Sequence, residues 1–266
     1  MTPFEIRPGD SPVILAIPHT GTYVPRDIFA RLTPLGQTLS DTDWHIERLY
    51  EGLLPGATIV RALFHRYVID ANRDPSGASL YPGQNTTGLV PLTDFDGKPL
   101  WTGEPDAAEI EDRRKAWHEP YHAALAAEIE RVRSRHGIAV LYDCHSIRSE
   151  IPFLFEGTLP DLNIGTDGGR TCARRFEDAV TAICARQEGL THILNGRFKG
   201  GWTTRHYGRP EENVHTIQME LAQKTHLASE ALPFAYDETR AAALRQPLRE
   251  ILRTLEALAS TPGETK

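Results

Sequence analysis

The 266-residue sequence predicts an α/β fold, built as a single domain over residues 1–266. We expect a mostly parallel or mixed central sheet with helices on both faces. Short apolar runs, typical of buried strands, alternate along the chain with longer segments of helical periodicity. The sequence also contains no internal repeat and no linker-like stretch that would divide it.

The strands are predicted from apolar runs bounded by turn residues. The run at 12–17 (PVILAI) ends at a Pro-His-Thr-Gly turn and is expected to be central. Further strands are expected at 57–62 (ATIVRA), 66–73 (RYVIDANR), 138–143, 191–194 (THIL) and 215–221 (HTIQMEL).

The helices are predicted from apolar residues at helical spacing. We expect them at 41–54, at 106–135 with an interruption at Pro120, at 168–187 and at 236–260. Asp41 is a plausible N-cap of the first. Residues 74–105 and 147–166 have no clear period, and irregular segments of this length are commonly functional or disordered.

Composition and charge exclude several classes of partner. The formal net charge of −7 argues against a nucleic-acid or anionic-membrane partner, either of which favours a basic surface. No apolar run approaches the roughly 18–20 residues that span a bilayer, and the N-terminus lacks a signal-peptide pattern. Three cysteines without metal-like spacing, Cys144, Cys172 and Cys184, suit the reducing cytoplasm.

A polar cluster, Asp-Cys-His-Ser, follows the apolar run that begins at residue 138. Ligands bind at the carboxyl ends of strands in open α/β sheets. Successive side chains on a strand point to opposite faces, so Asp143 and His145 share one face, while Cys144 and Ser146 share the other. This alternation disfavours a Cys144–His145 nucleophilic pair and favours contact between Asp143 and His145.

A second histidine, His19, follows the strand predicted at 12–17. Two histidines and a carboxylate with an open fourth position form the usual catalytic zinc site. Asp43 is the better candidate for the carboxylate, and Asp41 is the alternative. Asp143 would then orient the imidazole of His145 from behind. These residues predict a site for Zn²⁺ or another divalent cation.

The segment HEPYH at 118–122 matches the H-E-x-x-H zinc motif of metalloproteases. That motif needs an unbroken helix, and Pro120 lies inside it. Proline disfavours helical geometry at the preceding residue and fits best at the first position of a new helix. We therefore prefer His19 and His145 as metal ligands over His118 and His122.

Three further segments offer groups that could bind or transform a substrate. Asn72 and Arg73 supply an amide and a guanidinium suited to a carboxylate, with a structural ion pair as the alternative. Arg205 lies in a glycine-rich loop and could reach a second anion. Glu220 is embedded among strand residues, where an unpaired carboxylate is costly, so we consider it as a general base.

Taken together, these segments resemble the N-formylglutamate amidohydrolase (deformylase) family, which is related to zinc-dependent exopeptidases. The resemblance rests on the order of the segments and covers most of the chain. They are IPHTGTYVP, SDTDWHIERLY, VIDANRDP, LYDCHSI, GGWTTRHYG and IQMELAQKTHL.

The resemblance implies a zinc-exopeptidase-like (phosphorylase/hydrolase-like) fold. It also implies hydrolysis of N-formyl-L-glutamate, a small dicarboxylate, to formate and L-glutamate in histidine degradation. The order of groups is also similar to that of zinc carboxypeptidases and aspartoacylases. Those relatives place the acidic ligand three residues after the first histidine, where this chain has Thr22. An aspartoacylase- or desuccinylase-like deacylase and a non-catalytic binder of acidic ligands are the alternatives.

Overall fold

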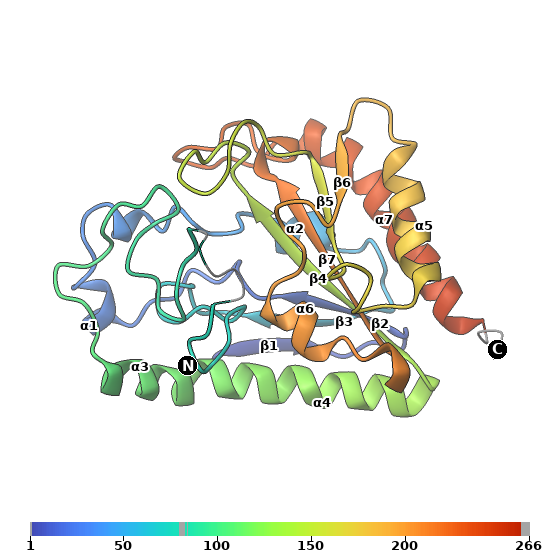
Figure 1. Ribbon diagram of the computed structural model, residues 1–266, viewed down its shortest axis with the longest axis horizontal. Helices are drawn as coiled ribbons and strands as arrows, with labels where there is room; N and C mark the ends of the chain where they lie inside the picture. The colour runs from blue at the N-terminus through green and yellow to red at the C-terminus, as the bar shows by residue number, and fades with distance from the viewer. Residues whose placement is uncertain (1, 80–82, 84, 262–266) are drawn as a thin grey trace.

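The computed structural model describes residues 2–79, 83 and 85–261, and its centre is a seven-stranded mixed sheet (Figure 1). The strand order is β1-β3-β2-β4-β7-β5-β6. The strands are β1 (Phe4–Arg7), β2 (Val13–Ile17), β3 (Thr58–Ala62), β4 (Ala139–Ile147), β5 (Leu162–Gly165), β6 (His192–Leu194) and β7 (Val214–Ala222).

The four central strands β3, β2, β4 and β7 run parallel. β1 is antiparallel to β3, and β5 is antiparallel to β7. Every residue of β2, β4 and β7 is buried, as expected where helices cover both faces of a sheet. This arrangement confirms the predicted fold class.

Helices pack on both faces of the sheet (Figure 1). α2 (Ile46–Tyr50), α5 (Arg174–Ala185) and α7 (Glu238–Ser260) cover one face, and α4 (Glu119–His136) covers the other. α3 (Ala107–Arg113) and a π-helical turn, η2 (Arg114–His118), lead directly into α4. The shorter pieces are α1 (Arg26–Phe29), α6 (Trp202–Tyr207), η1 (Gly36–Thr38), η3 (Pro210–Glu212) and η4 (Gln223–Thr225).

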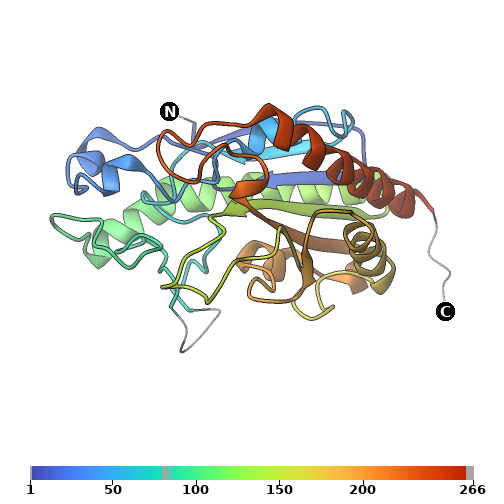
Figure 2. The same ribbon diagram turned by 90° about the horizontal axis from the view of Figure 1, so that it is seen from above.

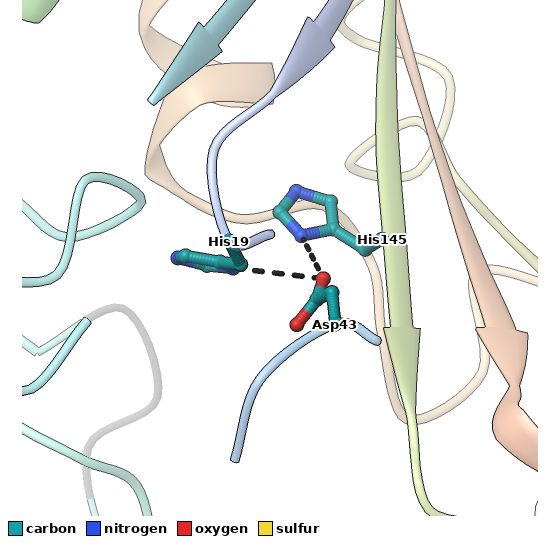
Figure 3. A group of neighbouring side chains, drawn as sticks. All are labelled: His19, Asp43 and His145. Atoms are coloured by element: carbon teal, nitrogen blue, oxygen red, sulfur yellow. Dashed lines mark ion pairs between the residues drawn. The ribbon is translucent and has the colours of Figure 1, made fainter. Parts of the chain in front are cut away.

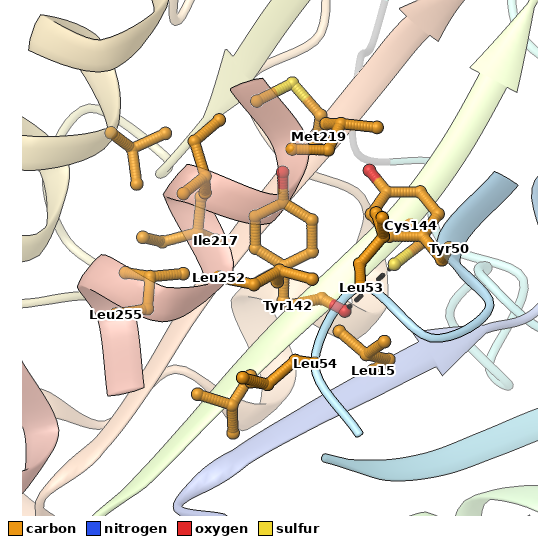
Figure 4. Close-up of a cluster of buried hydrophobic side chains, with 14 of the residues drawn as sticks. Leu15, Tyr50, Leu53, Leu54, Tyr142, Cys144, Ile217, Met219, Leu252 and Leu255 are labelled. Atoms are coloured by element: carbon orange, nitrogen blue, oxygen red, sulfur yellow. Dashed lines mark hydrogen bonds between the residues drawn. The ribbon is translucent and has the colours of Figure 1, made fainter. Parts of the chain in front are cut away.

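The larger apolar core lies between the sheet and α2, α5 and α7. In Figure 4, Leu15 of β2 and Met219 of β7 lie with Leu252 of α7 around the β4 residues Tyr142 and Cys144. Leu141 packs on the opposite face, in the core that includes α4. The alternation predicted for this strand is therefore present, and Cys144 is a core residue.

The predicted elements are recovered with some corrections. Residues 66–73 are not a strand, because the chain there forms turns. The helix predicted at 41–54 is limited to Ile46–Tyr50, and its N-cap is His45 rather than Asp41. The helix at 106–135 is not broken at Pro120, which sits in the first turn of α4 where its missing N–H is tolerated. The sequence does not predict β1 or β5. β5 lies inside the segment 147–166, which was expected to be irregular.

The long irregular segments gather beyond the carboxyl ends of the parallel strands, on the side away from the C-terminus (Figure 2). This is the edge at which open α/β sheets bind ligands. No helix within the described residues is long and apolar enough to cross a membrane.

Candidate active site at the carboxyl edge of the sheet

His19, Asp43 and His145 converge at this edge, each on a different segment (Figure 3). His19 follows β2, Asp43 lies in the loop before α2, and His145 is near the end of β4. Their candidate ligand atoms all lie within 4.8 Å of one another. Asp43 Oδ2 is 3.8 Å from His19 Nδ1 and 3.3 Å from His145 Nδ1.

The tautomer of His19 follows from its second contact. His19 Nε2 lies 2.7 Å from Asp70 Oδ1, so it carries the hydrogen and donates it to the carboxylate. Burial and the nearby Arg66 lower the pKa of His19, which keeps the ring neutral. Nδ1 is then an unprotonated nitrogen that is buried without a hydrogen-bond partner among the described residues.

His145 is also held from behind by a carboxylate. Its Nε2 lies 3.0 Å from Asp143 Oδ1, the contact that strand alternation predicted. Burial opposes a charge on this ring, but Asp143 and Asp43 raise the pKa of His145 well above its usual value. The two carboxylates thus make a strongly cation-stabilising environment around the ring.

Asp43 is fixed by two donors. Arg66 donates to Oδ1 at 2.6 Å, and the backbone N–H of Ser146 donates to Oδ2 at 3.0 Å. Burial opposes ionisation of this carboxyl, but Arg66 and His145 bring its pKa below the usual value. Asp43 is therefore a buried, ionised and oriented carboxylate.

This donor set fits a zinc ion. Two ligands that are each about 2.0–2.2 Å from a tetrahedral zinc lie about 3.4 Å apart, close to the 3.3 and 3.8 Å measured here. Catalytic zinc sites combine imidazole and carboxylate ligands, and partners such as Asp70 and Asp143 orient the imidazoles. The unpartnered His19 Nδ1 is the atom that such an ion would satisfy.

Asp41, the alternative ligand, is directed elsewhere. Its Oδ2 accepts hydrogen bonds from the Tyr67 hydroxyl at 2.8 Å and from the Phe95 N–H at 3.0 Å. Burial raises the pKa of Asp41 to about 7. The geometry therefore favours Asp43 as the acidic member of the group.

Glu220 lines a pocket together with His19 and His145. Its side chain is buried, and burial raises the pKa of Glu220 to about 8, although His145 opposes the shift. Gln218 donates to Glu220 Oε2 at 3.2 Å and accepts from the Gly201 N–H at 2.7 Å. A carboxyl oriented in this way, with a pKa near neutrality, is suited to proton transfer.

Three arginines line the same pocket: Arg66, Arg73 and Arg197. Arg73 is positioned by Thr87, with Nε 3.0 Å from its carbonyl oxygen and Nη2 2.9 Å from its hydroxyl. Arg197 donates to the carbonyl oxygens of Leu154 and Asn85, both at 3.2 Å. The pocket therefore offers guanidinium groups to a ligand in a protein of net negative charge, although Arg66 is paired with Asp43.

Arg205 is not among the residues that line this pocket. Its Nε donates to the Gly200 carbonyl at 2.9 Å and lies 3.4 Å from Asp167 Oδ1. Arg205 lies in α6 rather than in the expected glycine-rich loop, and Arg197, from the loop that precedes α6, lines the pocket instead. The loop has no periodicity from which the orientation of its cations could be predicted.

The H-E-x-x-H residues do not form a metal site. His118 Nε2 lies 3.1 Å from the Arg73 carbonyl oxygen, and His122 Nε2 lies 2.7 Å from the Ala71 carbonyl oxygen. Glu119 is exposed and pairs with Arg114 at 3.1 Å. The two imidazoles are hydrogen-bond donors to backbone, and no carboxylate of the motif faces them.

Sequence reasoning missed Arg66, Asp70, Arg197 and Gln218. Arg66 and Asp70 stand in an otherwise apolar stretch, and buried charges of this kind are retained where they have partners. Charged residues within an apolar stretch are therefore the sequence feature that could have identified Arg66 and Asp70. Gln218 lies two residues before Glu220 on β7 and shares its face.

The fold and the site together define an α/β protein with a candidate metal centre at the carboxyl edge of its sheet. Comparison with known proteins gives the family: the N-formylglutamate amidohydrolase family model matches residues 11–227, and the chain belongs to that family. This membership confirms the resemblance seen in the sequence segments.

Individual proteins named for this activity are similar to the chain over nearly its whole length. The N-formylglutamate deformylase of Pseudomonas aeruginosa is 45% identical over 257 residues, which cover 95% of this chain and 96% of that protein. The deformylase of Pseudomonas putida is 42% identical over 254 residues, 94% of each chain. The crystal structure of N-formylglutamate amidohydrolase from Ralstonia eutropha superposes with a TM-score of 0.81 at 26% identity, covering 97% of this chain and 98% of the other.

Proposed function

We propose that the protein hydrolyses N-formyl-L-glutamate to formate and L-glutamate, with zinc or another divalent metal as cofactor, as a step of histidine degradation. The observation that carries the proposal is that one pocket brings His19, His145 and Glu220 together with three arginines. The deformylase relatives support the substrate. Three free, buried cysteines suit a reducing compartment, and we place the reaction in the cytoplasm.

His19, Asp43 and His145 would hold the metal through two imidazole nitrogens and one carboxylate oxygen. A zinc ion in such a site supplies a water molecule whose pKa is lowered to about 7 and polarises a carbonyl group. The buried partners Asp70, Asp143 and Arg66 keep the three ligands in place.

Glu220 would act as the proton carrier. It accepts a proton from the attacking water and donates it to the amide nitrogen that leaves as the amine of glutamate. Gln218 fixes the carboxyl group, and the raised pKa of Glu220 lets it both hold and release a proton near neutral pH. Because the nucleophile is water, no nucleophilic side chain is required.

Arg73 and Arg197 would bind the two carboxylates of the substrate. Guanidinium groups pair with carboxylates through parallel hydrogen bonds, and both side chains are already held in position by backbone carbonyls. Asn72 adds an amide to the same pocket. A dicarboxylate is therefore the substrate class that this pocket fits best.

The test is formate release from N-formyl-L-glutamate by the purified protein, before and after chelation and after zinc is restored. We expect release that a chelator abolishes and zinc recovers. N-acetyl-L-aspartate and an N-succinyl amino acid serve as comparison substrates for the deacylase alternative. Turnover of either in preference to N-formyl-L-glutamate would overturn the proposed substrate, and binding without turnover would favour a non-catalytic binder.

A further inference from the structure

The H-E-x-x-H histidines contact the segment that carries Asn72 and Arg73. This segment forms turns rather than a strand, so no neighbouring strand supplies hydrogen bonds to it. Buried backbone carbonyls need a donor. His122 Nε2 supplies it for Ala71 at 2.7 Å, and His118 Nε2 supplies it for Arg73 at 3.1 Å. The two donors thus flank Asn72 on either side.

The two imidazoles are themselves held in place. His118 ends the π-helical turn and His122 lies one turn later in α4, with ring centroids 4.3 Å apart. Because the Ala71 carbonyl oxygen can only accept, the hydrogen of the neutral His122 ring is on Nε2. Its Nδ1 lies 3.0 Å from the Tyr207 hydroxyl, which donates to the His122 carbonyl oxygen at 3.2 Å. Both rings lie against Trp202, at 5.6 and 4.7 Å between centroids.

The side chain of Asn72 is fixed from the opposite direction. Its Oδ1 accepts the Thr203 N–H at 2.8 Å, at the start of α6. A Cβ at Gly201 would lie 2.3 Å from Asn72 Nδ2, so only glycine leaves room for this amide. Its Nδ2 in turn lies 3.2 Å from His145 Nε2. The Asn72 side chain is therefore held by α6 beside the candidate metal centre, while the residues before and after it are held by His122 and His118.

We infer that His118 and His122 are positioning residues that set the backbone of residues 71–73, and through it aim Asn72 and Arg73 into the pocket. The inference rests on the proposed function for its kinetic readout. It gives the H-E-x-x-H segment a role in substrate binding instead of metal binding. Loss of His122 leaves the buried Ala71 carbonyl without this donor, and loss of His118 does the same to the part-buried Arg73 carbonyl, which favours a displaced loop.

The kinetic test compares His118→Leu with His118→Gln, whose amide retains a donor near the position of Nε2. We expect His118→Leu to raise KM for N-formyl-L-glutamate by about 10-fold or more, with a smaller change in kcat, because displacement of binding groups weakens substrate binding. His118→Gln should restore most of the loss. His136→Leu, in the last turn of α4, is the control.

A second measurement does not depend on activity. Amide hydrogen exchange over residues 66–74 should quicken in His118→Leu and return toward the wild-type rate in His118→Gln. His122→Gln, a second donor-retaining variant, should keep the wild-type exchange rate. Zinc content should be unchanged in all of these variants.

The two readouts separate failure of this inference from failure of the proposed function. If the wild-type protein releases no formate, the proposed function is overturned, while exchange still decides the positioning role. If His118→Leu leaves both KM and exchange at wild-type values, the positioning role is overturned. Loss of bound zinc in His118→Leu would instead support the metalloprotease-like motif and overturn the inference.

Discussion

Glu220 is the register partner of His145 across the parallel strands β7 and β4. Two residues earlier, Gln218 pairs in register with Asp143. Because register partners point to the same face, these four polar side chains form a single patch where the two strands approach their carboxyl ends. The pairing places the candidate base beside a candidate metal ligand without any loop being needed to bring them together.

We predict that His145→Ala removes stoichiometric metal from the protein. The substitution deletes one of the candidate ligand nitrogens and leaves Asp43 and His19 with an incomplete site. Metal per polypeptide, measured by mass spectrometry of the purified protein, should fall to near zero while circular dichroism stays unchanged. Asp43→Asn should behave in the same way, whereas Asp41→Asn should retain metal. Full metal content in His145→Ala would refute this ligand set.

Glu220→Gln should lower kcat with little change in KM. Glutamine keeps the shape of the side chain but cannot accept a proton, and general acid–base catalysis contributes about 10²–10⁴-fold. Steady-state formate release gives both constants, and metal content should be unchanged. Gln218 donates a hydrogen bond to Glu220, so Gln218→Leu serves as a companion variant in which the loss of kcat should be smaller. Near-normal kcat in Glu220→Gln would remove this residue from the mechanism.

Alanine substitutions of Arg73, Arg197 and Arg205 should raise KM to different extents. Arg73→Ala and Arg197→Ala remove cations that line the pocket, so each should chiefly raise KM. Arg205→Ala removes a cation directed at Gly200 and Asp167, so KM should change less. The comparison is made under identical assay conditions. A larger rise in KM for Arg205→Ala than for Arg197→Ala would restore the assignment made from the sequence.

Cys144→Ser should retain most of its activity. Cys144 is fully buried on the core face of β4, its Sγ lies 3.5 Å from the Tyr142 carbonyl oxygen, and burial raises the pKa of the thiol well above its usual value. A neutral, inaccessible thiol is a poor nucleophile. Formate release and metal content are measured together. A loss of several orders of magnitude with metal intact would revive a cysteine mechanism.

The parts of the site that sequence reasoning identified share one physical origin. Polar residues directly after apolar strands must meet at one edge of a parallel sheet, which is how His19 and His145 were paired. Strand alternation likewise assigned Asp143 and Cys144 to opposite faces. These inferences depend only on the two-residue alternation of side chains along a strand and on the direction in which the strands run. Both can be read from the residue pattern.

The remaining features depend on contacts between segments that lie far apart in the chain. The apolar run at 66–73 has the composition of a strand, but its carbonyls are paired by histidines of the π-helical turn and α4. Which cation of the glycine-rich loop faces the pocket depends on contacts of Arg197 with Leu154 and Asn85. Neither relationship leaves a periodic signature.

His226 should make the stability of the fold depend on pH. This ring is fully buried, its Nε2 lies 3.1 Å from the Trp44 carbonyl oxygen, and burial lowers the pKa of His226 to about 4. In the unfolded chain a histidine has a pKa of about 6.5. The unfolded state therefore binds a proton that the folded state does not over the interval between these two values.

The contribution of His226 to the free energy of unfolding is fully present above about pH 6.5 and is lost progressively as the pH falls toward 4, by roughly 3 kcal/mol in all. His226→Gln removes the titration, while its amide can still donate to Trp44. Urea unfolding should show the variant gaining stability relative to wild type as the pH falls through this window. Titration of the candidate metal ligands occurs in both proteins and cancels in the difference. A difference in stability between wild type and variant that stays constant with pH would therefore show that His226 does not titrate as its burial implies.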